Sequence, residues 1–84
     1  MTHEIKILEQ YAHAVKGGEK TFEIRYNDRG YQKGDRIRFR VIDDIGAHVY
    51  SSLEKMEFEI TYVHSGLGMA DNYVALAIRP VEDR

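Results

Sequence analysis

The sequence contains no cysteine, and this absence excludes several kinds of chemistry. Without thiols the chain has no disulfide, no cysteine nucleophile and no cysteine-based zinc site. Its four histidines, His3, His13, His48 and His64, do not show a metal-binding spacing such as His-x-x-x-His. We therefore predict neither a metal site nor a cofactor.

Long apolar runs are absent as well. No segment is apolar over the length that a membrane-spanning helix needs, so we expect no membrane partner. Residues 2–10 are interrupted by Glu4, Lys6 and Glu9, which is unlike a signal peptide, and a cytoplasmic protein is expected. A chain of 84 residues is predicted to form a single domain over residues 1–84 with a modest core.

Charge is unevenly distributed along the chain, although its net value is only −2. Residues 16–40 hold eight Lys and Arg against four acids, a net charge of +4, whereas residues 41–84 hold three basic residues against eight acids, a net charge of −5. The basic segment favours an anionic ligand. The alternative is that the two halves of the chain pair with each other in the fold.

The hydrophobic periodicity predicts one helix and five strands. Leu8, Tyr11, Ala12 and Val15 follow helical spacing, so a helix is expected to run to about Lys16. Apolar and polar residues alternate over residues 3–7, 21–26, 36–41, 57–63 and 73–78, which indicates strands, and the single proline, Pro80, ends the last one. Residues 51–54 could form one helical turn. Mostly antiparallel strands of this number need closure to hide their edges, so we predict an α+β or mainly β small barrel.

The stretch from Gly17 to Tyr26 carries the densest polar chemistry. Gly17 and Gly18 are expected to end the helix. In the strand that follows, we predict Phe22, Ile24 and Tyr26 on the core face, and Tyr62 likewise in the core or at the barrel rim. The opposite face would then carry Thr21, Glu23 and Arg25, with Lys20 at the start of the strand.

Gly18, Lys20, Glu23 and Arg25 match the pattern G-x-K-x-x-E-x-R. The chain therefore resembles a small stand-alone activating-signal-cointegrator homology (ASCH) domain of the PUA-like superfamily. This resemblance implies a PUA-like β-barrel of about five strands with one substantial helix, and a cleft that binds RNA or a nucleotide-like ligand.

The same resemblance suggests roles for single residues. Lys20 and Arg25 would contact phosphate or base acceptors. Glu23 would orient Arg25 or accept a hydrogen bond from a base amino group. Arg29 and Tyr31 would lie at the rim of the cleft. No catalytic residue is assigned.

Three other interpretations of these residues remain open. Some ASCH-like proteins are amidohydrolases that act on a modified nucleoside with a Lys, a Thr nucleophile and a distant acid. Here Glu23 stands at the position of that Thr, and a carboxylate cannot replace a hydroxyl nucleophile, which argues against an enzyme. Thr21 lies two residues out of place, and the distant acid could be Glu57, Glu59 or Asp71. The domain could instead bind a protein partner, or the cluster could be a structural ion-pair network.

A second group of basic residues, Arg36, Arg38 and Arg40, shares one face of the strand at 36–41. Such a stripe could follow a nucleic-acid backbone. If the strand at 57–63 is its antiparallel neighbour, Glu57 and Glu59 would lie opposite these arginines. We favour cross-strand ion pairs over a nucleic-acid contact at this stripe.

Overall fold

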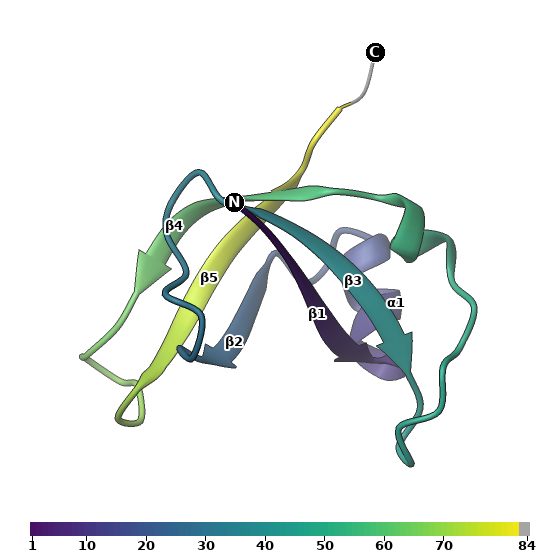
Figure 1. The fold of residues 1–84 in the computed structure, drawn as a ribbon, viewed down its shortest axis with the longest axis horizontal. Helices are drawn as coiled ribbons and strands as arrows, with labels where there is room; N and C mark the ends of the chain where they lie inside the picture. Colours follow the sequence, from purple (N-terminus) through teal and green to yellow (C-terminus); the bar gives the residue numbers. More distant parts are fainter. Residues whose placement is uncertain (83–84) are drawn as a thin grey trace.

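The computed structural model describes residues 1–82 and has the expected order of elements (Figure 1). One short helix and five strands are present in this part of the chain, as the periodicity predicts. The elements are β1 (Thr2–Leu8), α1 (Glu9–Lys16), β2 (Phe22–Tyr26), β3 (Arg36–Ile42), the 3₁₀ helix η1 (Ser52–Lys55), β4 (Phe58–His64) and β5 (Tyr73–Pro80).

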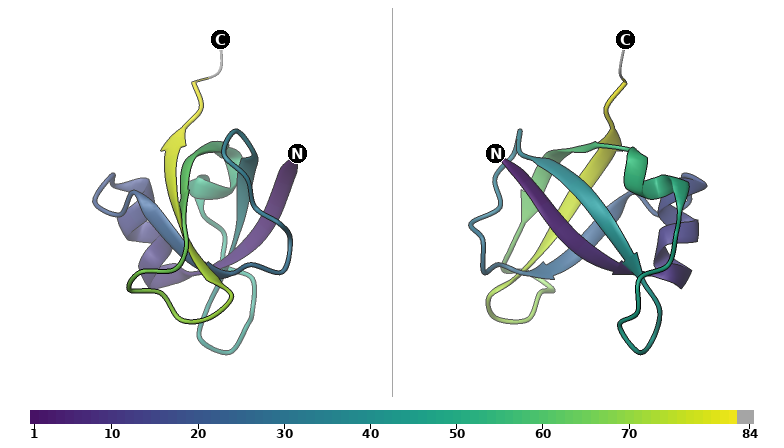
Figure 2. Two further views of the ribbon diagram at one scale, coloured as in Figure 1. Left: turned by 90° about the vertical axis from the view of Figure 1, so that its left-hand side faces the viewer. Right: turned by 45° about the vertical axis from the view of Figure 1, so that its right-hand side comes forward.

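The strands form one mixed sheet in the order β1-β3-β4-β5-β2. β1 and β3 are parallel, and the other three neighbouring pairs are antiparallel. β3 and β4 pair only through Arg36 with Glu59 and Ile37 with Phe58, so the sheet bends sharply at this junction. The β1–β3 pair and the β4–β5–β2 group become two wings of a half-barrel, which Figures 1 and 2 show from three directions. The predicted α+β, mainly β barrel-like fold is confirmed.

The core lies inside this bent sheet and is made by inward-facing residues from both wings. β1 and β3 alternate cleanly between buried and exposed positions, as their sequences predict. The helix contributes Ala12 and Val15 and the 3₁₀ helix contributes Leu53. The most fully buried side chains are Ile5, Ile37, Val41, Leu53, Phe58, Ile60 and Leu76.

β2 faces the opposite way from the prediction. Phe22, Ile24 and Tyr26 were expected in the core, yet they are 44%, 53% and 51% exposed, whereas Glu23 is only 5% exposed. β2 is an end strand of the sheet, and the Arg25 side chain on its inner face reaches the unpaired edge of β1 at the carbonyl oxygen of Lys6. Lys20 and Arg25 both lie within ionic distance of Glu23 there, which makes burial of the carboxylate tolerable.

An irregularity in β4 reverses a second prediction. Ile60 pairs with Ile78, but the next pair on β5 joins Tyr62 to Ala77, so one extra residue is inserted between them. Such a bulge shifts the alternation of side chains by one position. Val63 therefore packs against the core, and Tyr62, predicted to lie in the core or at the barrel rim, is 62% exposed.

No helix within residues 1–82 is long and apolar enough to cross a membrane.

Because β2 points its apolar residues outward, truncating an isoleucine of β2 and truncating one of β4 should change the free energy of unfolding by different amounts. Ile60→Ala removes a fully buried side chain and should lower the free energy of unfolding by about 2–5 kcal/mol. Ile24→Ala removes an exposed one and should cost less than about 1 kcal/mol. Urea unfolding followed by far-UV circular dichroism measures both, and a loss at Ile24 as large as that at Ile60 would place β2 the other way round.

Candidate functional site

A cleft lies between β2 on one side and the end of β1 with the start of α1 on the other. Its volume is about 500 Å³. Most of its wall is apolar, and the polar groups belong to the G-x-K-x-x-E-x-R segment, to one lysine of β1 and to Tyr11 of α1. The lining residues are Lys6, Ile7, Leu8, Tyr11, Lys20, Phe22, Glu23, Ile24, Arg25 and Ile42.

The end of α1 places Lys20 at the entrance of this cleft. Gly18 adopts a φ of +83°, a left-handed conformation that glycine takes without steric cost. The backbone N–H groups of Glu19 and Lys20 both donate to the carbonyl oxygen of Ala14. The chain is thereby turned back along the helix before it enters β2, as the glycine pair predicts.

The ammonium group of Lys20 is held by two oxygens and two aromatic rings. Its Nζ donates to the carbonyl oxygen of Phe22 at 2.7 Å and to Oε1 of Glu23 at 2.5 Å. It also lies 4.8 Å from the centre of the Phe22 ring and 5.5 Å from the centre of the Tyr11 ring. A cation at these distances is attracted to the ring face. An ammonium has three N–H donors, so one remains beyond these two hydrogen bonds.

Glu23 is the buried acid of the site. While Oε1 is bound to Lys20, Oε2 lies 3.8 Å from Nη1 of Arg25, which is too long for a hydrogen bond. Within residues 1–82, all buried side-chain nitrogen and oxygen atoms that are closed to solvent have a hydrogen-bond partner. Oε2 is therefore an acceptor that is not fully closed to solvent, on a residue that lines the cleft.

Two arginines bridge the gap between β2 and the free edge of β1. Nη1 of Arg25 donates to the carbonyl oxygen of Lys6 at 2.8 Å, and Nη1 of Arg29 donates to that of Glu4 at 2.7 Å. These bonds satisfy backbone acceptors that a neighbouring strand would take in a closed barrel. The half-barrel is thus joined across its open side by side chains.

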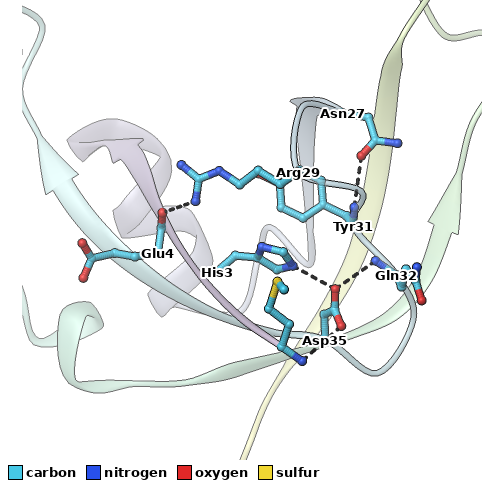
Figure 3. Close-up of polar contacts among 8 residues, drawn as sticks. His3, Glu4, Asn27, Arg29, Tyr31, Gln32 and Asp35 are labelled. Atoms are coloured by element: carbon cyan, nitrogen blue, oxygen red, sulfur yellow. Dashed lines mark hydrogen bonds and ion pairs between the residues drawn. The ribbon is translucent and has the colours of Figure 1, made fainter.

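The structure brings three of the five predicted ligand residues together. Lys20, Glu23 and Arg25 share the cleft, but Arg29 and Tyr31 are not among its lining residues. Arg29 extends along β1 to Glu4, and Tyr31 is 4% exposed with its ring edge-on to His3 at 4.8 Å (Figure 3). Tyr31 is therefore a core residue beside a second polar cluster.

This second cluster is organised around Asp35 (Figure 3). Oδ2 of Asp35 is 2.8 Å from Nε2 of the buried His3 and accepts from the backbone N–H of Gln32, while the amino group of Met1 lies 3.4 Å from Oδ1. The hydrogen bond with His3 lowers the pKa of Asp35 below its ordinary value of 3.8; burial opposes this shift, and the Gln32 N–H and the N-terminal amine add to it. The His3 ring is therefore directed toward the Asp35 carboxylate.

The arginine stripe of β3 pairs with carboxylates, as favoured from the sequence. Nη1 of Arg36 lies 3.3 Å from Oε1 of Glu57, and Nε of Arg38 lies 3.8 Å from Oε2 of the same residue. Glu59 instead accepts from Arg79 on β5 at 2.9 Å. The predicted basic segment is therefore partly neutralised by the acidic half of the chain.

Residues 1–82 contain no group of three or more His, Asp or Glu side chains arranged to hold a metal ion.

Sequence reasoning missed the aromatic and apolar walls of the cleft. Tyr11 belongs to the predicted buried face of the helix, and Phe22 and Ile24 to the predicted core face of β2, but all three line the cleft. The sequence offers no signal for these walls, because alternation along β2 fixes the period of two and leaves open which set of residues points inward.

A half-barrel with a polar cluster in an apolar cleft defines the class of protein, a small mainly β domain with one candidate binding site. Residues 2–78 match the family described as Domain of unknown function (DUF3850), and the chain belongs to that family. A solved structure titled "Crystal structure of hypothetical protein PH0355" is similar in fold, with a TM-score of 0.62 and 19% identity over 96% of this chain and 100% of that one. No curated protein matches the chain.

The Lys20–Glu23 pair predicts a strong coupling between the two residues. Lys20→Met leaves a buried carboxylate without its nearest cation and should lower the free energy of unfolding by about 1–3 kcal/mol. Adding Glu23→Gln removes that charge and should recover much of the loss. A double-mutant cycle measured by urea unfolding tests this, and additive effects would show that the two residues act independently.

The lowered pKa of Asp35 predicts acid sensitivity. Because protonation is harder in the folded state, the stabilising contribution is complete above the unfolded-state value of 3.8 and is lost as the pH falls through the lower folded value. Asp35→Asn should be less stable than wild type at neutral pH and show a flatter stability profile from about pH 5 to about pH 2. Asp44→Asn, in an exposed loop, is the control and should keep the wild-type slope.

Proposed function

We propose that this domain binds RNA or a nucleotide-like ligand in the cleft, as its resemblance to the ASCH domains of the PUA-like superfamily implies. The observation that carries the proposal is the position of the Lys20 ammonium, which lies within 5.5 Å of the centres of two aromatic rings and is hydrogen-bonded to Glu23. A nucleotide offers an aromatic base with donors and acceptors on its edge, joined to an anionic phosphate.

Each wall of the cleft matches one part of such a ligand. The rings of Tyr11 and Phe22 and the apolar side chain of Ile24 offer surfaces on which a base can stack. Oε2 of Glu23 would accept from a base amino or imino group, while the remaining N–H of Lys20 would donate to a base acceptor or to phosphate. Arg25 positions the Glu23 side of the site through its bond to β1.

The charge of the chain favours a small or specific site over broad coating of nucleic acid. The net charge is −2, and two arginines of β3, Arg36 and Arg38, lie within ionic distance of Glu57. Only a few phosphates would then be neutralised on binding. Affinity for single-stranded RNA should consequently fall by less than about 10-fold between roughly 50 mM and 200 mM salt.

The test is a titration with a mixed pool of labelled single-stranded RNA and with the four nucleoside 5′-monophosphates. The test variant is Lys20→Met/Glu23→Gln, which keeps the net charge and leaves no buried charge unpaired. It should lose at least about 10-fold in affinity, since the ammonium donor is removed and the carboxylate acceptor becomes a neutral amide.

The matched control is Lys16→Met/Glu19→Gln, which makes the same changes at the same spacing on exposed residues beside the cleft motif. It should bind like wild type. If wild type binds neither RNA nor a monophosphate at low salt, or if both double variants bind equally well, the cleft is not a nucleotide site.

A further inference from the structure

The outer face of the β4–β5–β2 wing carries an unusual group of exposed apolar side chains, here called the aromatic face: Phe22, Ile24, Tyr26, Tyr62 and Tyr73. These residues share one side of the sheet, because residues that pair across neighbouring strands point to the same face. Tyr26 pairs with Tyr73, Ile24 with Ala75, and both Phe22 and Tyr62 with Ala77. Four of the five are aromatic, and all are at least 41% exposed.

The register gives this face the form of a trough. Between Tyr73 and Arg79, the central strand β5 presents only the small side chains of Ala75 and Ala77, while its neighbours β4 and β2 present larger ones. The two walls stand on strands about 10 Å apart. Tyr26 and Tyr73 close one end of the trough, with their rings edge to face at 5.5 Å. The opposite end lies beside Phe22.

The trough is continuous with the cleft. Phe22 and Ile24 line the cleft and also belong to the aromatic face. The Lys20 ammonium lies 4.8 Å from the centre of the Phe22 ring, so a cationic group marks the junction. An extended ligand that leaves the cleft past Lys20 would therefore pass onto the aromatic face.

Charge around the trough gives it a direction. Arg79 follows Ala77 on the same strand and is paired with Glu59, and the half-buried His64 pairs across from Ala75. The loops beyond the Tyr26–Tyr73 end carry the acids Asp28 and Asp71, and their one nearby arginine, Arg29, is bound to the carbonyl oxygen of Glu4. We therefore expect phosphate groups near Lys20 and stacking at the tyrosine end.

We propose that the aromatic face is a second, stacking subsite for single-stranded RNA that extends from the cleft; this inference rests on the proposed function. The trough spans the outward residues of β2 from Phe22 to Tyr26, about 13 Å of strand, which leaves room for a short run of nucleotides beyond the one in the cleft. Aromatic rings bind bases with little sequence preference, because every base has a stacking face.

The test compares a fluorescein-labelled RNA hexamer pool with the four nucleoside 5′-monophosphates. Wild type should bind the hexamer at least about 10-fold more tightly than any monophosphate. Tyr26→Ala/Tyr73→Ala should lower hexamer affinity between about 5-fold and about 100-fold and leave monophosphate affinity unchanged. Tyr26→Phe/Tyr73→Phe should retain hexamer binding, because a phenyl ring still stacks.

Tyr50→Ala is the control, since this tyrosine is 91% exposed and lies outside the wing. As a second measurement, the ring protons of Tyr26 and Tyr73 should shift upfield in NMR spectra with the hexamer and not with a monophosphate. Far-UV circular dichroism verifies that each variant is folded.

The outcomes separate the two proposals. If Lys20→Met/Glu23→Gln weakens both ligands while the tyrosine variants bind the hexamer like wild type, the cleft site stands and the stacking subsite is overturned. If wild type binds neither ligand, both proposals fail. If the wild type self-associates in sedimentation and Tyr26→Ala/Tyr73→Ala abolishes this without changing hexamer affinity, the face is an interface between copies and the stacking proposal is overturned.

Discussion

The burial of one carboxylate, Glu23, determines the arrangement of the whole candidate site. A buried acid needs a cation and hydrogen-bond donors close by, because its transfer from water is otherwise costly. Lys20 approaches from the end of the helix and Arg25 from two residues further along the same strand. Once Glu23 points inward, the period of two along a strand forces Phe22, Ile24 and Tyr26 outward. The cleft and the aromatic face both follow from this choice.

The second constraint is the open edge of the half-barrel. β1 and β2 are the end strands of the sheet, and unpaired backbone groups at such edges can recruit other chains. Here Arg25 and Arg29 donate to the carbonyl oxygens of Lys6 and Glu4 and so cover part of the β1 edge. Side chains, unlike a sixth strand, leave space between the two edges. That space is the cleft, so the incomplete closure of the barrel and the presence of a binding cavity have one cause.

The contacts of Lys20 are the part of the cleft on which the binding proposal rests. Its ammonium group is engaged by Glu23, by a backbone oxygen and by two aromatic rings, and it lines a mostly apolar cleft. The family to which the chain belongs and the fold it shares with the hypothetical protein PH0355 define the architecture. Function has to be argued from the site, because one fold supports many activities.

The sequence by itself determined the number and order of the strands, the helix and its glycine end, and the proximity of Lys20, Glu23 and Arg25, because these depend on local periodicity and spacing. It did not determine which face of β2 is buried, since alternation fixes a period and leaves open which set of residues points inward. The extra residue before Tyr62 and the burial of Tyr31 beside His3 were equally hidden. Only the tertiary structure decided these features, because each depends on a partner distant in the chain: β1 for β2, β5 for the bulge, and the start of β1 for Tyr31.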